Sequence, residues 1–387
     1  WLDMTKSEEW AFNLCENSFF SLFSFANPIG KKGKELCDVI IICGSDIVLI
    51  SVKEINIKPS DNFEVDYSRW TKRAIESSLK QLNGAERFLI SSSNFKLEDG
   101  KIEIELPKEK NFYKIALAIG GQRKFPMPES IENNGYVNIM DEISFHCIIS
   151  ELDTITDFLD YLKEKQEKLT SIHFSGQGEE DLLAFYLSNG FDFPNDTYLF
   201  LDDDLYESAK TSAEYIKERE KKKNSYKWDF IINQISHNHF QRNGYNTDTL
   251  NSMIIACKLM AQETRHERVK LVNNLEHVIN SNVRARIFYS PSFNHIIYVF
   301  LSSKFNNSNE RRKELEIRCL VAAFLYNKSA AVIGIAWEKQ NDLDTYDVVY
   351  HNYQEVWTNQ FDRNALNAIN DLGYFKNHYN ELQNTES

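Results

Sequence analysis

The sequence predicts an α/β protein with an N-terminal α/β sandwich core, a mixed and largely helical extension, and a C-terminal α/β domain. Three observations predict it: two β-branched runs joined by a two-residue turn, amphipathic helices on either side of them, and a second set of helices and strands nearer the C-terminus. The length of 387 residues suits two or three domains. We expect domains at 1–125, 126–230 and 231–387, with the charged run 217–227 close to the last boundary.

The first domain is predicted to begin with a helix over residues 7–20, where apolar side chains recur at helical spacing. Two β-branched strands follow at 36–43 and 46–53, and the dipeptide Gly44-Ser45 between them is typical of a hairpin turn. Both strands are apolar on both faces. The hairpin is therefore expected in the middle of a sheet that is covered on each side.

A second helix is predicted over residues 68–82, ending at Asn83-Gly84, because glycine commonly follows the last turn of a helix. The apolar runs after it predict further strands at 87–91, 101–105 and 113–119. This order of elements describes an α/β sandwich of about 120 residues.

The rest of the chain continues with both kinds of element, and no internal repeat is visible in it. The predicted strands are 136–139, 145–149, 285–290, 295–303 and 330–338. The predicted helices begin near residue 153 and span 179–188, 250–261, 268–279 and 309–327.

Composition excludes several classes of protein. With 42% hydrophobic residues the chain is not disordered, and its net charge of -13 argues against coating nucleic acid with the whole surface. The six cysteines are scattered without a CxxC pair, which predicts reduced thiols. The apolar runs are too short to span a bilayer, and no apolar leader segment is visible. We therefore expect a cytoplasmic protein without a membrane partner.

The predicted hairpin places Asp38, Ser51 and Lys53 on one face. If Gly44-Ser45 is the turn, cross-strand partners have numbers that sum to 89 and Asp38 faces Ser51. If the turn lies one residue later, the sum is 91 and Asp38 faces Lys53. All three share a face in both registers, because side chains alternate along a strand. A buried Asp and Lys are costly unless they are paired or functional, so a structural ion pair and a catalytic site are the two interpretations.

The catalytic interpretation has a defined chemical requirement. Metal-assisted hydrolysis of a phosphodiester needs carboxylates that hold a hard cation through oxygen, and a nearby positive group that orients water or stabilises developing charge. Asp38 would supply the carboxylate and Lys53 the positive group.

Here the sequence resembles the PD-(D/E)XK nuclease superfamily, which has the restriction-endonuclease-like fold. The resemblance implies that Asp38 binds the metal, Lys53 is catalytic and Gln81 supports the site from the following helix. It also implies an acid from the first helix, either Glu9 or Glu16, of which we prefer Glu9. It further implies a Mg²⁺- or Mn²⁺-dependent endonuclease that acts on nucleic acid, DNA more than RNA, in bacterial defence against phages or plasmids.

The resemblance covers about residues 5–120 and departs from the family pattern at Ser51, where an acid is expected two residues before the lysine. The acids that can replace it are Glu35, Glu54 and Glu76. The expected metal ligands are Asp38, Glu9 and Glu35. The alternative is a catalytically degenerate nuclease-fold protein that binds nucleic acid or a partner protein as a scaffold.

Basic side chains before and after the hairpin can form a local phosphate-binding cleft. They are Lys31, Lys32, Lys34, Arg69, Lys72, Arg73 and Lys80. The alternative is a solvated helix face on which Lys72 pairs with Glu76. We expect the C-terminal region to serve regulation, homo-oligomer assembly or recognition of a partner protein.

Overall fold

The computed structural model describes residues 4–385 apart from internal gaps. The gaps are 59, 98–99, 101, 122–134, 169–172, 176–177, 196–197, 203, 244–251, 282, 304, 306, 341–342 and 355, and the side chains of 173–175, 237–243, 340, 343 and 385 are not described. The chain forms two compact units, one reaching Arg219 and the other starting at Glu220. Their division lies within the charged run 217–227. Most of the segment 126–230 belongs to the first unit.

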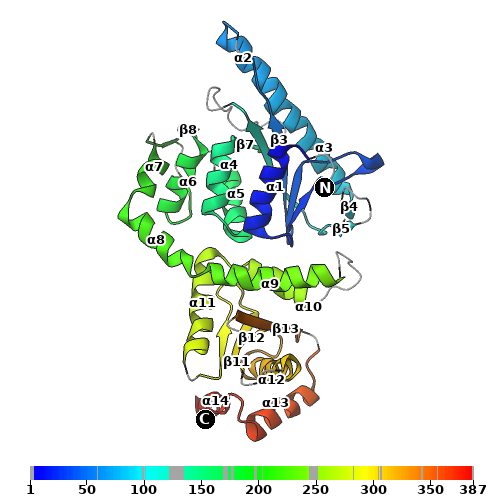
Figure 1. The fold of residues 1–387 in the computed structure, drawn as a ribbon, viewed down its shortest axis with the longest axis vertical. Coiled ribbons are helices and arrows are strands. Elements are labelled where there is room, and N and C mark those ends of the chain that lie inside the picture. Colours follow the sequence, from blue (N-terminus) through cyan, green and yellow to red (C-terminus); the bar gives the residue numbers. More distant parts are fainter. Residues whose placement is uncertain are drawn as a thin grey trace. The chain divides into compact units, whose positions relative to one another are not determined.

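A five-stranded mixed sheet forms the centre of the first unit (Figure 1). Its strands, in spatial order, are β1 (Ser24–Ala26), β2 (Val39–Cys43), β3 (Asp46–Glu54), β6 (Asn111–Ile119) and β7 (Asn138–Met140). The hairpin β2–β3 is antiparallel, and β6 joins β3 in parallel orientation. The unit is therefore mixed α/β, as the sequence predicts.

The hairpin has the first of the two predicted registers. Cys43 lies opposite Asp46 and Val39 opposite Ile50, so partner numbers sum to 89. Gly44 occupies the turn with φ of 60°, a left-handed conformation that glycine adopts without steric cost. Almost every side chain of the two strands is buried, which places the hairpin in the interior of the sheet.

One continuous helical segment, built from α2 (Phe63–Trp70), the π-helical turn η2 (Thr71–Glu76) and α3 (Ser77–Ser91), leads from β3 to the strands that follow. Its buried face contributes Trp70, Ile75 and Leu82 to a core that includes Ile40 and Leu49 of the hairpin. The helices α1 (Lys6–Phe19) and α4 (Glu142–Glu151) also pack on this sheet (Figure 1). The hairpin is thus covered by helices, as expected.

Two expectations about this helix were wrong. The helix does not end at Asn83-Gly84 but continues to Ser91, so residues 87–91 are helical and form no strand. Ala85 and Leu89 continue the buried stripe of Leu82, and the burial of that stripe outweighs the lower helix propensity of glycine.

The strand expected at 145–149 is also wrong, since these residues lie within α4. Asp141 caps the helix by accepting hydrogen bonds from the backbone N–H groups of Ile143 and Ser144. The other elements of the unit are η1 (Lys31–Gly33), β4 (Asn94–Lys96), β5 (Glu103–Glu105), α5 (Ile155–Lys168), β8 (His173–Ser175), α6 (Glu179–Ser188), β9 (Tyr198–Phe200), α7 (Leu205–Lys210) and α8 (Ala213–Lys223), whose last residues enter the second unit.

The second unit is built on a four-stranded sheet in the order β10-β11-β12-β13. Its strands are β10 (Ala285–Tyr289), β11 (Ile296–Ser302), β12 (Ala331–Gln340) and β13 (Leu343–Asn352). Its helices are α9 (Tyr226–Asn243), α10 (Ser252–Ala261), α11 (Arg265–Asn280), α12 (Ser308–Tyr326), α13 (Asn359–Asp371) and α14 (Lys376–Thr385). The strands β10, β11 and β12 match the expectation, and β13 pairs with β12 as a further hairpin.

The cysteines agree with the expectation of reduced thiols. All six cysteines are free thiols, and five of them are buried. Within the described residues, every helix is too short or too polar to cross a membrane.

Candidate functional site

Asp38 lies at the open end of the β2–β3 hairpin, one residue before β2 begins. Its side chain is buried, and its Oδ2 accepts a hydrogen bond of 2.5 Å from the backbone N–H of Val52. Its own backbone N–H donates to the carbonyl of Ile50, the residue that also lies opposite Val39. The hairpin itself therefore fixes the carboxylate in position.

Lys53 lies beside this carboxylate at the same end of β3. Its Nζ is 3.5 Å from Asp38 Oδ2 and donates to the carbonyl of Val52 at 3.1 Å. The Asp38 side chain is 3% exposed, whereas that of Lys53 is 27% exposed. One member of the pair is thus anchored in the interior and the other reaches solvent, where a bound phosphate can meet it.

A chain of polar contacts connects the pair to the helix that follows. The buried Ser51 donates from its Oγ to Gln81 Oε1 at 2.8 Å, and Gln81 Nε2 donates to Glu35 Oε1 at 3.4 Å. The Glu35 carboxyl is in turn hydrogen-bonded to Asp38. The structure therefore brings together Asp38, Lys53, Ser51, Gln81 and Glu35, which we call the acid–lysine cluster.

The two acids of the cluster influence each other. The pKa of the Glu35 carboxyl rises from an ordinary value of 4.5 to about 7. Loss of surrounding water is the largest cause, and the hydrogen bond to Asp38 and the charges of Asp38 and Glu8 add to it. The positive charge of Lys53 acts in the opposite direction. The Glu35 carboxyl therefore holds a proton below a pH of about 7.

The acid predicted from the first helix is placed differently from the expectation. Glu9 is exposed on α1, and the α1 acid whose charge acts on Glu35 is its neighbour Glu8. Glu8 also closes a capping box with Thr5, and the spacing Thr-x-x-Glu is the sequence signal that identifies that role. Of the remaining alternatives, Glu54 accepts a hydrogen bond from Ser7, and Glu76 is exposed on η2.

The donor atoms of the cluster suit a hard divalent cation. Two carboxylates, an amide oxygen and a hydroxyl offer oxygen alone, and Mg²⁺ commonly takes only one or two protein carboxylates and keeps several waters. Among the described residues no group of three or more His, Cys, Asp or Glu side chains is arranged to hold an ion. The cluster therefore fits a cation completed by water and substrate oxygens, and does not form an all-protein cage.

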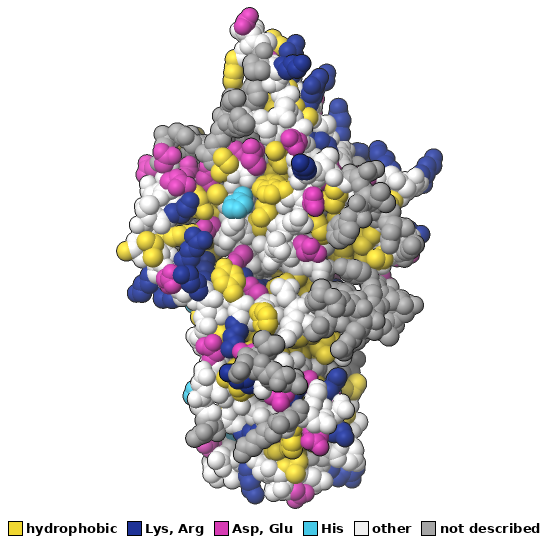
Figure 2. Space-filling model, viewed as in Figure 1, with side chains coloured by type: hydrophobic (Ala, Val, Ile, Leu, Met, Phe, Trp, Pro, Cys, Tyr) yellow, Lys and Arg dark blue, Asp and Glu magenta, His cyan; other side chains and the backbone are white. Residues whose placement is uncertain are grey.

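The basic residues predicted to bind phosphate are exposed. Lys31, Lys32 and Lys34 lie in or beside η1, and Arg69, Lys72, Arg73 and Lys80 lie along the α2–α3 helix. Figure 2 shows Lys and Arg side chains along one side of this helix. Arg69 is 3.7 Å from Asp66, but no ion pair joins Lys72 to Glu76 in the described part of the chain. The alternative of a salt-bridged Lys72 is therefore not what the structure shows.

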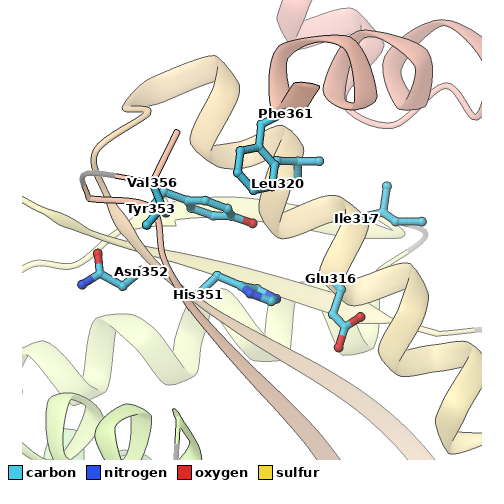
Figure 3. Close-up of a pocket in the computed structure, with 8 residues that line it drawn as sticks. All are labelled: Glu316, Ile317, Leu320, His351, Asn352, Tyr353, Val356 and Phe361. Atoms are coloured by element: carbon cyan, nitrogen blue, oxygen red, sulfur yellow. The ribbon is translucent and has the colours of Figure 1, made fainter. Parts of the chain in front are cut away.

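The second unit has an open pocket of about 330 Å³ between α12, the end of β13 and α13 (Figure 3). It is lined mainly by apolar side chains, among them Tyr353 and Phe361. Burial lowers the pKa of the His351 ring, which therefore enters this pocket as a neutral group. Its Nε2 has no hydrogen-bond partner. Nothing in the sequence predicted this pocket, because its walls come from three separate elements.

Comparison of the chain with protein-family models, with curated proteins and with solved structures gave no match.

Proposed function

We propose that this protein is a divalent-metal-dependent nuclease that hydrolyses phosphodiester bonds, with DNA as the preferred substrate, and that its first unit is a restriction-endonuclease-like core. The observation that carries the proposal is the acid–lysine cluster, in which two coupled carboxylates and a lysine meet at the open end of a buried hairpin. A purely structural ion pair would need neither the second carboxylate nor a partly exposed lysine.

Each residue of the cluster has a role that its contacts support. A bound Mg²⁺ or Mn²⁺ supplies Lewis-acid stabilisation of the phosphate and lowers the pKa of water. Asp38 and Glu35 would hold that ion, Val52 N–H fixes the orientation of Asp38, and Gln81 orients Glu35. Lys53 is placed to orient the attacking water or to stabilise negative charge on the phosphate.

The proposal is tested by incubating supercoiled plasmid with the protein in Mg²⁺, in Mn²⁺ and in EDTA. We expect cleavage with either ion and none in EDTA, because the carboxylates alone cannot stabilise the transition state. A single-stranded RNA of matched length tests the preference for DNA. Absence of cleavage under every condition, together with retained DNA binding, would instead favour the degenerate scaffold in which Ser51 replaces the second acid.

The raised pKa of Glu35 predicts a pH dependence of cation binding. Below a pH of about 7 the carboxyl holds a proton that the cation must displace, and above that pH it is already ionised. We therefore expect Mn²⁺ affinity, measured by calorimetry, to rise with pH up to about 7 and then to level off. Glu35→Gln should weaken binding and flatten this profile. A profile that stays equally steep in Glu35→Gln would assign the proton to another group.

Exposed cations on the α2–α3 helix predict salt-dependent DNA binding. Changing Lys72, Arg73 and Lys80 together to Gln removes three cations without touching the core, since all three are exposed. If each meets a phosphate, the slope of log K against log [salt] becomes shallower by about 2–3. Fluorescence anisotropy on a duplex measures this slope. The charge-matched control is a variant of the second unit in which Lys270, Arg312 and Lys313 are changed together to Gln. Equal slopes in both variants would remove the helix from the binding surface.

A further inference from the structure

The pocket between α12, the end of β13 and α13 has walls that packing holds in place. The end of β13 is fixed by the pairing of His351 with Val332, and the backbone N–H of Tyr353 donates to the carbonyl of Ala330. The Tyr353 ring makes an edge-to-face contact with Phe361 of α13, with ring centres 5.8 Å apart. Walls that are already ordered lower the cost of binding a ligand.

Two polar side chains of this pocket have unused hydrogen-bonding groups. Within the described residues, neither nitrogen of the His351 ring has a hydrogen-bond partner, and neither does the hydroxyl of Tyr353. The two rings are stacked, with centres 5.8 Å apart, and both point toward α12 (Figure 3). Leaving polar groups unpaired away from water costs free energy, which a ligand with matching groups would recover.

The protonation states of these groups define the hydrogen bonds that a ligand can make. Burial lowers the pKa of the His351 ring below its ordinary value of 6.5, against a smaller opposing effect of the Glu316 charge. The neutral ring has one donor and one acceptor. Burial also raises the pKa of the Tyr353 hydroxyl, which therefore keeps its proton. Glu316, the charged residue of the described lining, is paired with Arg312 at 3.3 Å.

The other walls select a flat and apolar body. Ile317, Leu320 and Val356 offer hydrocarbon alone, and the volume of about 330 Å³ fits a single or fused ring better than a larger molecule. We infer that this pocket binds a neutral planar heteroaromatic ring with a hydrogen-bond donor beside an acceptor, the pattern that aromatic carboxamides and nucleobases share. His351 and Tyr353 bond its polar edge. The site lies within the second unit and does not depend on the proposed nuclease function.

The first test titrates the full chain with nicotinamide and with adenine, followed by saturation-transfer NMR. For rings of about ten non-hydrogen atoms we expect a dissociation constant of about 1 mM or lower for at least one probe. The probe that binds more tightly distinguishes a carboxamide from a nucleobase. Nicotinate has the same ring as nicotinamide but carries a carboxylate, and should bind about tenfold more weakly because apolar walls do not stabilise an anion.

The second test uses His351→Phe, which keeps a planar ring and removes both ring nitrogens. Probe affinity should fall about tenfold, whereas the temperature of unfolding should not fall, since the substitution breaks no hydrogen bond. His295→Phe is the matched control, because His295 is exposed in the same unit and does not line the pocket. Should His351→Phe fail to fold, Tyr353→Phe repeats the test by removing the hydroxyl alone.

Three results would overturn the inference. They are the absence of saturable binding of both probes, an unchanged probe affinity in the folded pocket variant, and binding of nicotinate as tight as that of nicotinamide. The first would leave a crevice that only water fills, and the second would place the probes elsewhere on the chain. The third would exclude selection for a neutral ring.

Discussion

Asp38→Asn should reduce metal-dependent cleavage by about 10³-fold or more, because losing the cation forfeits several kcal/mol of transition-state stabilisation and each 1.36 kcal/mol is a factor of ten. The substitution removes a charge but little else. Asn has the shape of Asp, and its amide oxygen can still accept the hydrogen bond from Val52 N–H. The hairpin should therefore stay intact while the cation loses its anchored ligand.

Asp46→Asn is the matched control, since Asp46 begins β3 at the closed end of the same hairpin. Its Oδ1 accepts a hydrogen bond of 2.9 Å from Asn111, a contact that the amide can keep. Initial rates on plasmid, with Mn²⁺ binding and thermal unfolding of each variant, separate catalysis from folding. Cleavage by Asp38→Asn at the wild-type rate would place the catalytic carboxylate elsewhere.

The part of the site that follows from local rules was predictable from the sequence. Strand alternation alone predicts that Asp38, Ser51 and Lys53 share a face, and the structure places Lys53 beside Asp38. The two-residue turn at Gly44-Ser45 predicts the register that β2 and β3 have. Gln81 lies on the helix that crosses back over that face, where it meets Ser51. These predictions needed only the alternation of side chains along a strand, the residues of the turn and the order of the elements.

The part that depends on packing was not predictable in the same way. Whether Glu8 or Glu9 acts on the cluster depends on the rotation of α1 about its own axis, which is fixed by the sheet beneath it. The helix that passes through Gly84 is stabilised by buried contacts far away in the sequence.

Ser51 at the position of an expected acid has a physical explanation in the cluster. The residue is fully buried, so a carboxylate there would have to be desolvated close to Asp38 and would raise the cost of ionising either group. Glu35 comes from the loop before β2 and brings a second carboxylate to Asp38 from a more solvated side. Asp38 and Glu35 therefore bring two carboxyl groups close to Lys53, although Ser51 is not an acid.

The largest effect on stability is expected at Asp229 in the second unit, which forms ion pairs with two buried arginines. Its Oδ1 lies 2.6 Å from Arg268 and its Oδ2 lies 2.8 Å from Arg265, and the Arg268 side chain is completely buried. Arg268 also donates to the carbonyls of Ala261 and Glu263 and so ties α11 to the end of α10. Removing one partner of a buried ion pair typically costs about 3–5 kcal/mol, because the other charge stays buried.

Asp229→Ala should therefore lower the free energy of unfolding of the second unit by about 3–5 kcal/mol, since neither guanidinium can lose its proton. Urea denaturation of the full chain, followed by the fluorescence of the buried Trp228 one residue away, measures this loss. Arg312→Ala is the control, because Arg312 and Glu316 form an exposed pair on α12, and exposed pairs contribute at most about 1 kcal/mol. Equal losses in the two variants would mean that water enters the buried cluster and screens the arginines. A smaller loss in Asp229→Ala accompanied by a changed denaturant slope would instead indicate that the helices rearrange around Arg268.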